Sequence, residues 1–157
     1  MHASLLLALL WMMLCCRAQT GEELECASLK DCLNLASVYS SSALQHERMK
    51  AHALYERACR YGEDSKDAWL GKGALEQDAG RLEEAWRSLC VAFLLDPSCW
   101  RVGINMGNLA ARRQQFGLAH RLFKHLTRVN PFLPQAHYSL GFLNLLYARY
   151  PSHGMVD

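Results

Sequence analysis

The sequence has little that would mark a catalytic, metal-binding or redox protein. It contains no Cys-x-x-Cys pair, which argues against a structural zinc site or a thioredoxin-like site. It has no His-Glu-x-x-His or Gly-x-Ser-x-Gly motif, and residues 71–73 lack the third glycine of a dinucleotide-binding loop. We therefore expect no enzyme activity, no bound metal and no cofactor.

The sequence also lacks long runs of one charge. Its 17 basic and 15 acidic residues give a formal net charge of +2 and are spread along the chain. Clustered basic residues are typical of nucleic-acid binding, so we expect no nucleic-acid partner. Neither an N-glycosylation sequon nor a Lys-Asp-Glu-Leu retrieval signal is present to report a compartment.

An apolar run does stand near the N-terminus, at residues 5–14. It is shorter than the roughly 20 residues that span a bilayer, and Cys16-Arg17-Ala18 after it fits the small-x-small pattern of a signal-peptidase site. We expect a signal peptide at residues 1–18, no stable membrane span after cleavage, and a secretory-pathway location, either the endoplasmic reticulum lumen or outside the cell. A buried N-terminal helix or a signal anchor is the alternative.

An odd number of cysteines would remain after cleavage of the signal peptide. Removing Cys15 and Cys16 leaves Cys26, Cys32, Cys59, Cys90 and Cys99. They cannot all pair within one chain, although an oxidising compartment favours disulfides. The sequence alone does not fix the pairing.

The main feature of the sequence is a recurrence at 34 residues. Asp-Pro at 96–97 returns as Asn-Pro at 130–131, and subtracting residue numbers gives the same interval for other positions, namely Gly73, Gly107 and Gly141, and Ala85 and Ala119. A fixed period of this size predicts stacked supersecondary units. Between residues 66 and 99, apolar periodicity predicts a helix over 66–79, a turn at Gly80 and a second helix over 82–95, which Pro97 ends. The small residues are expected where the two helices cross.

These residues resemble the tetratricopeptide-repeat (TPR) family. The second unit carries the family pattern at Trp69, Gly73, Ala85, Leu89, Ala92 and Pro97, and the third at Met106, Gly107, Ala119, Phe123 and Pro131. Lys72 and Glu76 depart from it, because leucine and tyrosine are usual there. The resemblance implies an all-α fold of antiparallel helix pairs stacked as a short superhelix, or α-solenoid.

In that register the chain divides into seven segments. They are the signal peptide at 1–18, an N-terminal segment at 19–31, a degenerate unit at 32–65, full units at 66–99 and 100–133, the first helix of an incomplete unit or a capping helix at 134–149, and a tail at 150–157. Leu89, Phe93, Leu94, Leu122, Phe123 and Leu126 are expected to be buried between units.

The resemblance also implies a working surface. In the family, the first helices line a concave groove that holds a peptide or a partner helix, and its inner positions here include Asp67, Leu70, Asp78, Arg101, Asn105, Asn108, Arg112 and Tyr138. We expect an acidic side at Asp67 and Asp78 and a basic side at Arg101 and Arg112. Solvated helix faces without a ligand are the alternative.

Two further expectations follow from helix packing. Antiparallel packing of the first unit would bring Cys32 to Cys59, so we expect a bridge between them, with Cys26 as the competing partner and buried free thiols as the alternative. The last helix is apolar on nearly every side, which predicts that Phe142, Leu145 and Tyr147 meet a partner or another copy, or that the chain is a truncated form of a longer array.

The sequence therefore predicts a non-catalytic protein-interaction module of the secretory pathway that captures a peptide or helix in its groove. The alternative is the non-catalytic N-terminal part of a larger lumenal enzyme, such as a glycosyltransferase or hydroxylase.

Overall fold

The computed structural model describes residues 26–62 and 64–149, with side chains described to residue 145. The predicted signal peptide and tail lie outside the described residues. The described part is helical without strands, which confirms the all-α prediction. Its helices are α2 (Leu29–Ser40), α3 (Gln45–Tyr61), α4 (Lys66–Asp78), α5 (Leu82–Leu95), α6 (Trp100–Arg112), α7 (Phe116–Val129) and α8 (Pro134–Arg149). None of them is both long enough and apolar enough to cross a membrane.

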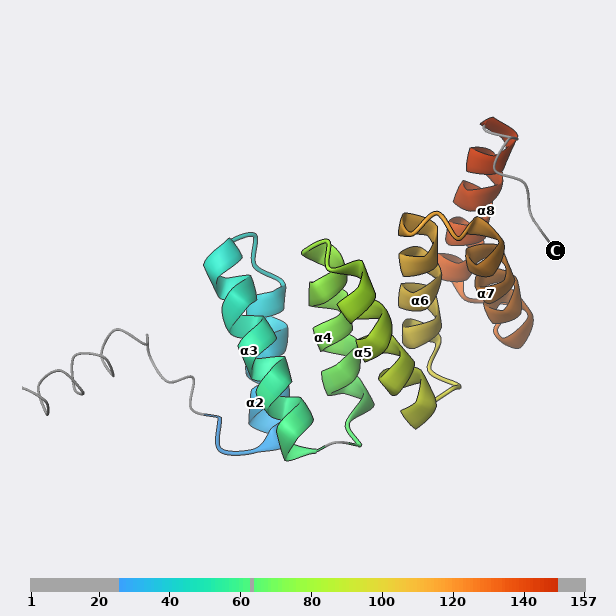
Figure 1. Cartoon of the computed structure of the whole chain (residues 1–157). Helices are drawn as coiled ribbons and strands as arrows, with labels where there is room; N and C mark the ends of the chain where they lie inside the picture. The colour runs from blue at the N-terminus through green and yellow to red at the C-terminus, as the bar shows by residue number, and fades with distance from the viewer. Residues whose placement is uncertain (1–25, 63, 150–157) are drawn as a thin grey trace, which may run out of the picture.

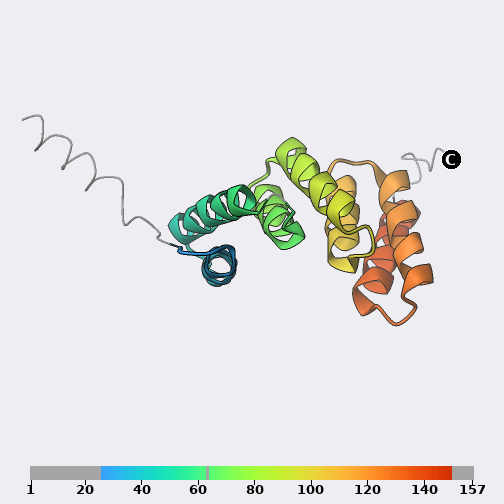
Figure 2. The same ribbon diagram turned by 90° about the horizontal axis from the view of Figure 1, so that it is seen from below.

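The helices form hairpins that stand side by side. Figure 1 shows α2 with α3, α4 with α5, and α6 with α7, followed by α8 packed against α7. Seen from below, the helices follow one another along the row, with α2 beside α3 and α4 beside α5 (Figure 2). Each junction between pairs buries its own apolar residues, so the core is a series of clusters along the array.

The helix ends repeat with the same period as the sequence. Gly80 turns the chain between α4 and α5 with a φ of 79°, and Gln114, 34 residues later, holds the equivalent place with a φ of 61°. Glycine adopts this left-handed conformation without the steric cost that a side chain adds. Beyond α5, the Asp96 carboxylate accepts a hydrogen bond from the backbone N–H of Ser98 at 3.1 Å. The Asn130 side chain does the same for Phe132 at 3.2 Å.

The glycines lie where the paired helices cross, as predicted. A Cβ on Gly73 would come within 2.9 Å of Leu89 on α5, and a Cβ on Gly107 within 2.4 Å of the Phe123 ring on α7. Contacts this close leave no room for a side chain, so glycine is what allows each pair to pack. Leu89 and Phe123 are themselves fully buried.

The burial prediction is wrong for two residues of α5. Leu94 is 79% exposed and Phe93 is 38% exposed. The buried stripe of α5 is Ala85, Leu89 and Ala92. Leu94 is five residues from Leu89, which turns it to the opposite side of the helix.

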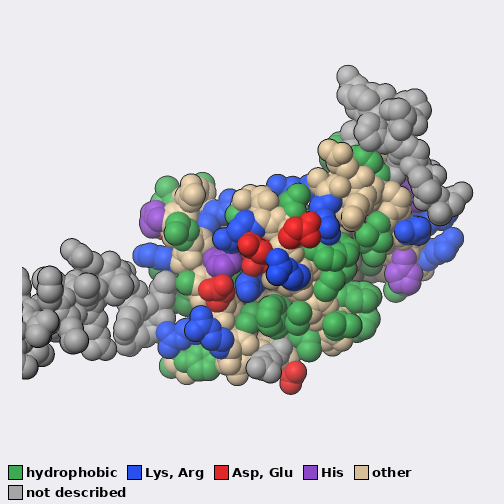
Figure 3. Space-filling model, viewed as in Figure 1, with side chains coloured by type: hydrophobic (Ala, Val, Ile, Leu, Met, Phe, Trp, Pro, Cys, Tyr) green, Lys and Arg blue, Asp and Glu red, His purple; other side chains and the backbone are tan. Residues whose placement is uncertain are grey.

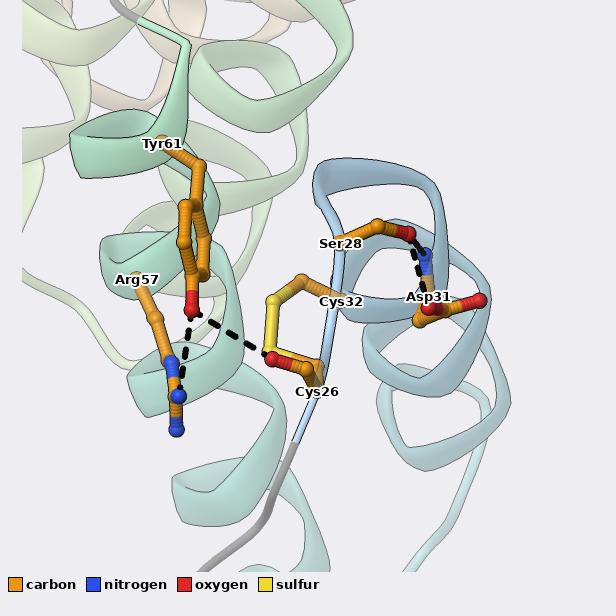
Figure 4. The surroundings of a disulfide bond; sticks show 6 residues. All are labelled: Cys26, Ser28, Asp31, Cys32, Arg57 and Tyr61. Carbon is orange, nitrogen blue, oxygen red and sulfur yellow. Dashed lines mark hydrogen bonds between the residues drawn. A yellow bond between two sulfur atoms is a disulfide. The ribbon is translucent and has the colours of Figure 1, made fainter.

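The first pair is closed by a disulfide that differs from the predicted one. Cys26 precedes α2 and pairs with Cys32 in its first turn, with their Cα atoms 5.1 Å apart (Figure 4). The Tyr61 hydroxyl donates to the Cys26 carbonyl at 3.4 Å and so ties this segment to the end of α3. The six-residue separation makes this the local pairing, whereas the expected Cys32–Cys59 bridge had to join two helices.

Cys59 is instead a free thiol in the core of the first pair. Burial raises its pKa to about 11, an effect that the Lys72 cation reduces but does not cancel. The raised pKa keeps Cys59 as a thiol, whereas the thiolate is the reactive form. Cys59 therefore acts as a small core residue, which agrees with the alternative of a buried free thiol.

Candidate functional site

The residues predicted to line a groove lie on α4, α6 and α8, the first helices of successive units. Positions 34 residues apart repeat along these helices. Leu70, Ile104 and Tyr138 form one such row, and Ala74, Asn108 and Phe142 form another. The surface is therefore a set of parallel rows crossing the array.

The charged residues of this surface are not separated into an acidic and a basic side. Arg101 lies 3.7 Å from Asp67 across the α4–α6 junction, and both side chains are more than half exposed. Asp78 pairs with Arg48 of α3 at 2.7 Å. Arg112 donates a hydrogen bond to the Gln77 carbonyl at 2.5 Å. Opposite charges thus alternate between neighbouring units and join them.

Two amide side chains of α6 stand out because they have no internal partner. Asn105 and Asn108 are half-buried, and neither bonds to any residue that the structure describes. Their spacing of three residues puts both on one face of the helix. Each amide carries both donor and acceptor groups, so the pair can bond to an extended backbone.

The apolar members of the surface differ in their exposure. Leu70 of α4 is only 3% exposed, because it packs with Val102 and Met106 of α6, the first helix of the next unit. The prediction that Leu70 lies on the exposed surface of the groove is therefore wrong. Ile104 is half-buried, whereas Tyr138 on α8 is 77% exposed.

A second surface, which the sequence did not indicate, is a cleft of about 590 Å³ between α3, α4 and the turn that follows α4. It includes Arg48, Met49, His52, Leu75, Asp78 and Arg81 among its walls. Charged side chains are concentrated over the upper middle of the molecule in Figure 3, and apolar ones lie lower, over α5 and α6. Among the predicted groove residues, only Asp78 lines this cleft.

Behind the cleft lies a polar network that explains the departures at positions 72 and 76. The buried Glu76 carboxylate accepts a hydrogen bond from Ser88 at 2.7 Å. Its other oxygen lies 3.5 Å from His52 Nε2 and 3.8 Å from Lys72 Nζ. Lys72 also approaches Glu56 at 3.8 Å. Lys72 and Glu76, in place of the usual leucine and tyrosine, thus join α4 to α3 through charged groups, and Glu76 joins α4 to α5 through the Ser88 hydroxyl. The i, i+4 spacing of His52 and Glu56 is the sequence signal that could have indicated this network.

Comparison with known proteins gives matches at the level of structure alone. No family model matches the sequence, and no curated protein matches it. The chain superimposes with a TM-score of 0.70 on the first TPR of Spaghetti (RPAP3) bound to an HSP90 peptide, at 12% identity over 82% of this chain and 99% of that one. The fold is the TPR fold.

Two other TPR structures are similar. The Yersinia enterocolitica type III secretion chaperone SycD, in complex with a peptide of the translocator YopD, has a TM-score of 0.66 and 16% identity over 80% of this chain and 98% of that one. A Thermobaculum terrenum O-GlcNAc transferase has a TM-score of 0.69 and 22% identity over 74% of this chain. This chain spans 22% of that enzyme's length.

Proposed function

We propose that this TPR array is a non-catalytic interaction module that binds an extended peptide or a helix along α4, α6 and α8. The observation that carries the proposal is the pair of half-buried amides at Asn105 and Asn108, which no described residue satisfies. Polar groups that are half-withdrawn from water gain from a bonded ligand. Two of the TPR structures reported above contain a bound peptide, which supports the same role here.

In this mechanism the amides hold the ligand's backbone, and the neighbouring rows select its side chains. Tyr138 and Phe142 offer exposed aromatic surface on α8, which comes after α6 among the first helices of the stack. The Asp67–Arg101 pair lies at the other end of α6 from Arg112 and offers a charge of each sign. A peptide with an apolar residue flanked by a charged one fits this arrangement.

The test selects ligands from a library of random peptides on the immobilised chain and measures the affinity of the selected peptide by calorimetry. Replacing both amides, Asn105→Ala with Asn108→Ala, should weaken binding roughly 30-fold, because each lost hydrogen bond costs about 1 kcal/mol. The fold should survive, since neither amide has a described partner to lose.

The matched control removes two exposed polar side chains from the second helix α7, Arg121→Ala with His125→Ala. This variant should bind the selected peptide as the unaltered chain does. Equal affinity in the amide variant and the control, or no selected peptide at all, would contradict the proposal.

We also propose that the module acts in the secretory pathway. The apolar run at residues 5–14 supports this, and so does the Cys26–Cys32 disulfide, because such bonds persist in oxidising compartments. The mass of the chain recovered from secreting cells should correspond to a start at Gln19. Recovery of the uncleaved chain from the cytosol would rule out this location.

The second candidate is the non-catalytic TPR part of a larger lumenal enzyme. It is favoured by the similarity of this chain to 22% of the length of an O-GlcNAc transferase, which is an enzyme. Reading the transcript beyond the codon for Asp157 tests it, since further repeats or a catalytic motif are expected there. A stop codon in that frame would rule it out.

A further inference from the structure

Helix α8 has one packed face and one open face. Ala136 and Leu143 are fully buried against the preceding pair. On the other side, Tyr138 and Leu145 are 77% and 71% exposed, and Phe142 is 54% exposed. Tyr138, Gly141 and Leu145 are spaced three and four residues apart, so they form one stripe along the helix.

Gly141 makes this stripe different from an ordinary exposed surface. It is the counterpart of Gly73 and Gly107, on which Leu89 and Phe123 pack directly. At Gly141, a Cβ would meet nothing within 4 Å. The helix thus continues the apolar interior of the array and leaves the backbone open at the point where the preceding helices each receive a second helix.

The chemistry of α8 suits a second copy of itself. Residues 134–145 contain no Asp, Glu, Lys or Arg, so two such helices can approach without like-charge repulsion. The one histidine among them, His137, bonds through its ring to the Pro131 carbonyl at 2.7 Å. A charged partner helix would find no ion pair on this stripe.

We propose that two copies of the chain associate through α8, with the helices crossing at Gly141 and with Tyr138 and Leu145 packed on either side of the crossing. An isologous contact of this kind uses the same stripe on both copies. Glycine at the crossing lets the two backbones approach closely, as it does inside the units. The inference does not depend on peptide capture by Asn105 and Asn108.

The test is sedimentation equilibrium of the full chain over a range of concentrations, with three variants. Gly141→Leu should weaken the dimer by at least about tenfold, because a large side chain keeps the backbones apart. The same change should raise the melting temperature of the monomer, since leucine favours helix over glycine and meets no neighbour there. Opposite effects on association and on folding separate a blocked contact from a damaged protein.

The second variant, Tyr138→Lys with Leu145→Lys, should give a monomer at every concentration, because it places like charges on both copies. Leu94→Lys on α5 is the matched control, since Leu94 is an equally exposed leucine outside the stripe, and it should leave the dimer unchanged. A dimer that survives Gly141→Leu, or that Leu94→Lys disrupts equally, would overturn the proposal. An unaltered chain that stays monomeric would also overturn it and leave the stripe to a helix of another protein.

Discussion

The pairs α4–α5 and α6–α7 and the single helix α8 carry the same pattern in different surroundings. In the two pairs, a glycine on the first helix lies under a large apolar side chain of the second. In α8, the same glycine is open and the apolar side chains beside it are exposed. The burial of a residue in this array is therefore set by whether the next helix is present, as expected of a fold in which each unit contacts only its neighbours.

The row formed by Leu70, Ile104 and Tyr138 shows the same effect. Leu70 is covered by α6, Ile104 is half-covered, and Tyr138 has no following helix among the described residues. The exposure of Tyr138 is consequently a property of the end of the described array as much as of the groove. A ligand on the first helices and a second copy on α8 would meet at this residue.

The largest expected effect on stability comes from adding a side chain at a glycine that the second helix of its pair already covers. Gly107→Ala places a Cβ 2.4 Å from the buried Phe123 ring, which must move. Overpacking of this kind costs about 3 kcal/mol, and the better helix propensity of alanine recovers about 1 kcal/mol, so the free energy of unfolding should fall by about 2 kcal/mol. Urea denaturation measures it, and an unchanged midpoint would show that this crossing tolerates a side chain.

A smaller expected effect is a loss of stability in acid, which the second unit should show through Asp96 and the third unit should not, because it has Asn130 at the equivalent position. Hydrogen bonds donated by Lys66 and Ser98 lower the pKa of the Asp96 carboxyl to about 2, from an ordinary 3.8. The stability from this group is present above pH 4 and is lost as the pH falls toward 2, because the unfolded chain binds the proton first.

The next unit has Asn130 where the second has Asp96, so Asp96→Asn gives both units the same cap. The variant should lose less stability between pH 4 and 2 than the unaltered chain does, as followed by thermal melting at each pH. Equal losses in the two proteins would show that Asp96 does not contribute to this acid sensitivity.

Most of the fold could be predicted from the sequence because its determinants are local and repeat. The 34-residue interval, the turn at Gly80 and the prolines after α5 and α7 fixed where helices begin and end. The recurring glycines indicate where the paired helices cross, because few residues permit such close approach of two helices.

The candidate site could be predicted less well, because it depends on how units meet. The pairing of Asp67 with Arg101, and of Asp78 with Arg48, brings together residues far apart in sequence. The disulfide was mispredicted for a related reason. Helix packing suggested Cys59, whereas the chain before α2 folds back locally and brings Cys26 to Cys32.

The difference between closed and open crossings is tested most directly by Gly141→Ala, measured in the same urea assay as Gly107→Ala and at a concentration low enough for monomer. Since a Cβ at Gly141 meets nothing, only helix propensity should change, and the free energy of unfolding should rise by up to about 1 kcal/mol. Opposite signs for the two substitutions are the predicted result. Destabilisation by Gly141→Ala to the same extent as by Gly107→Ala would mean that a helix already covers this glycine, and would contradict the account.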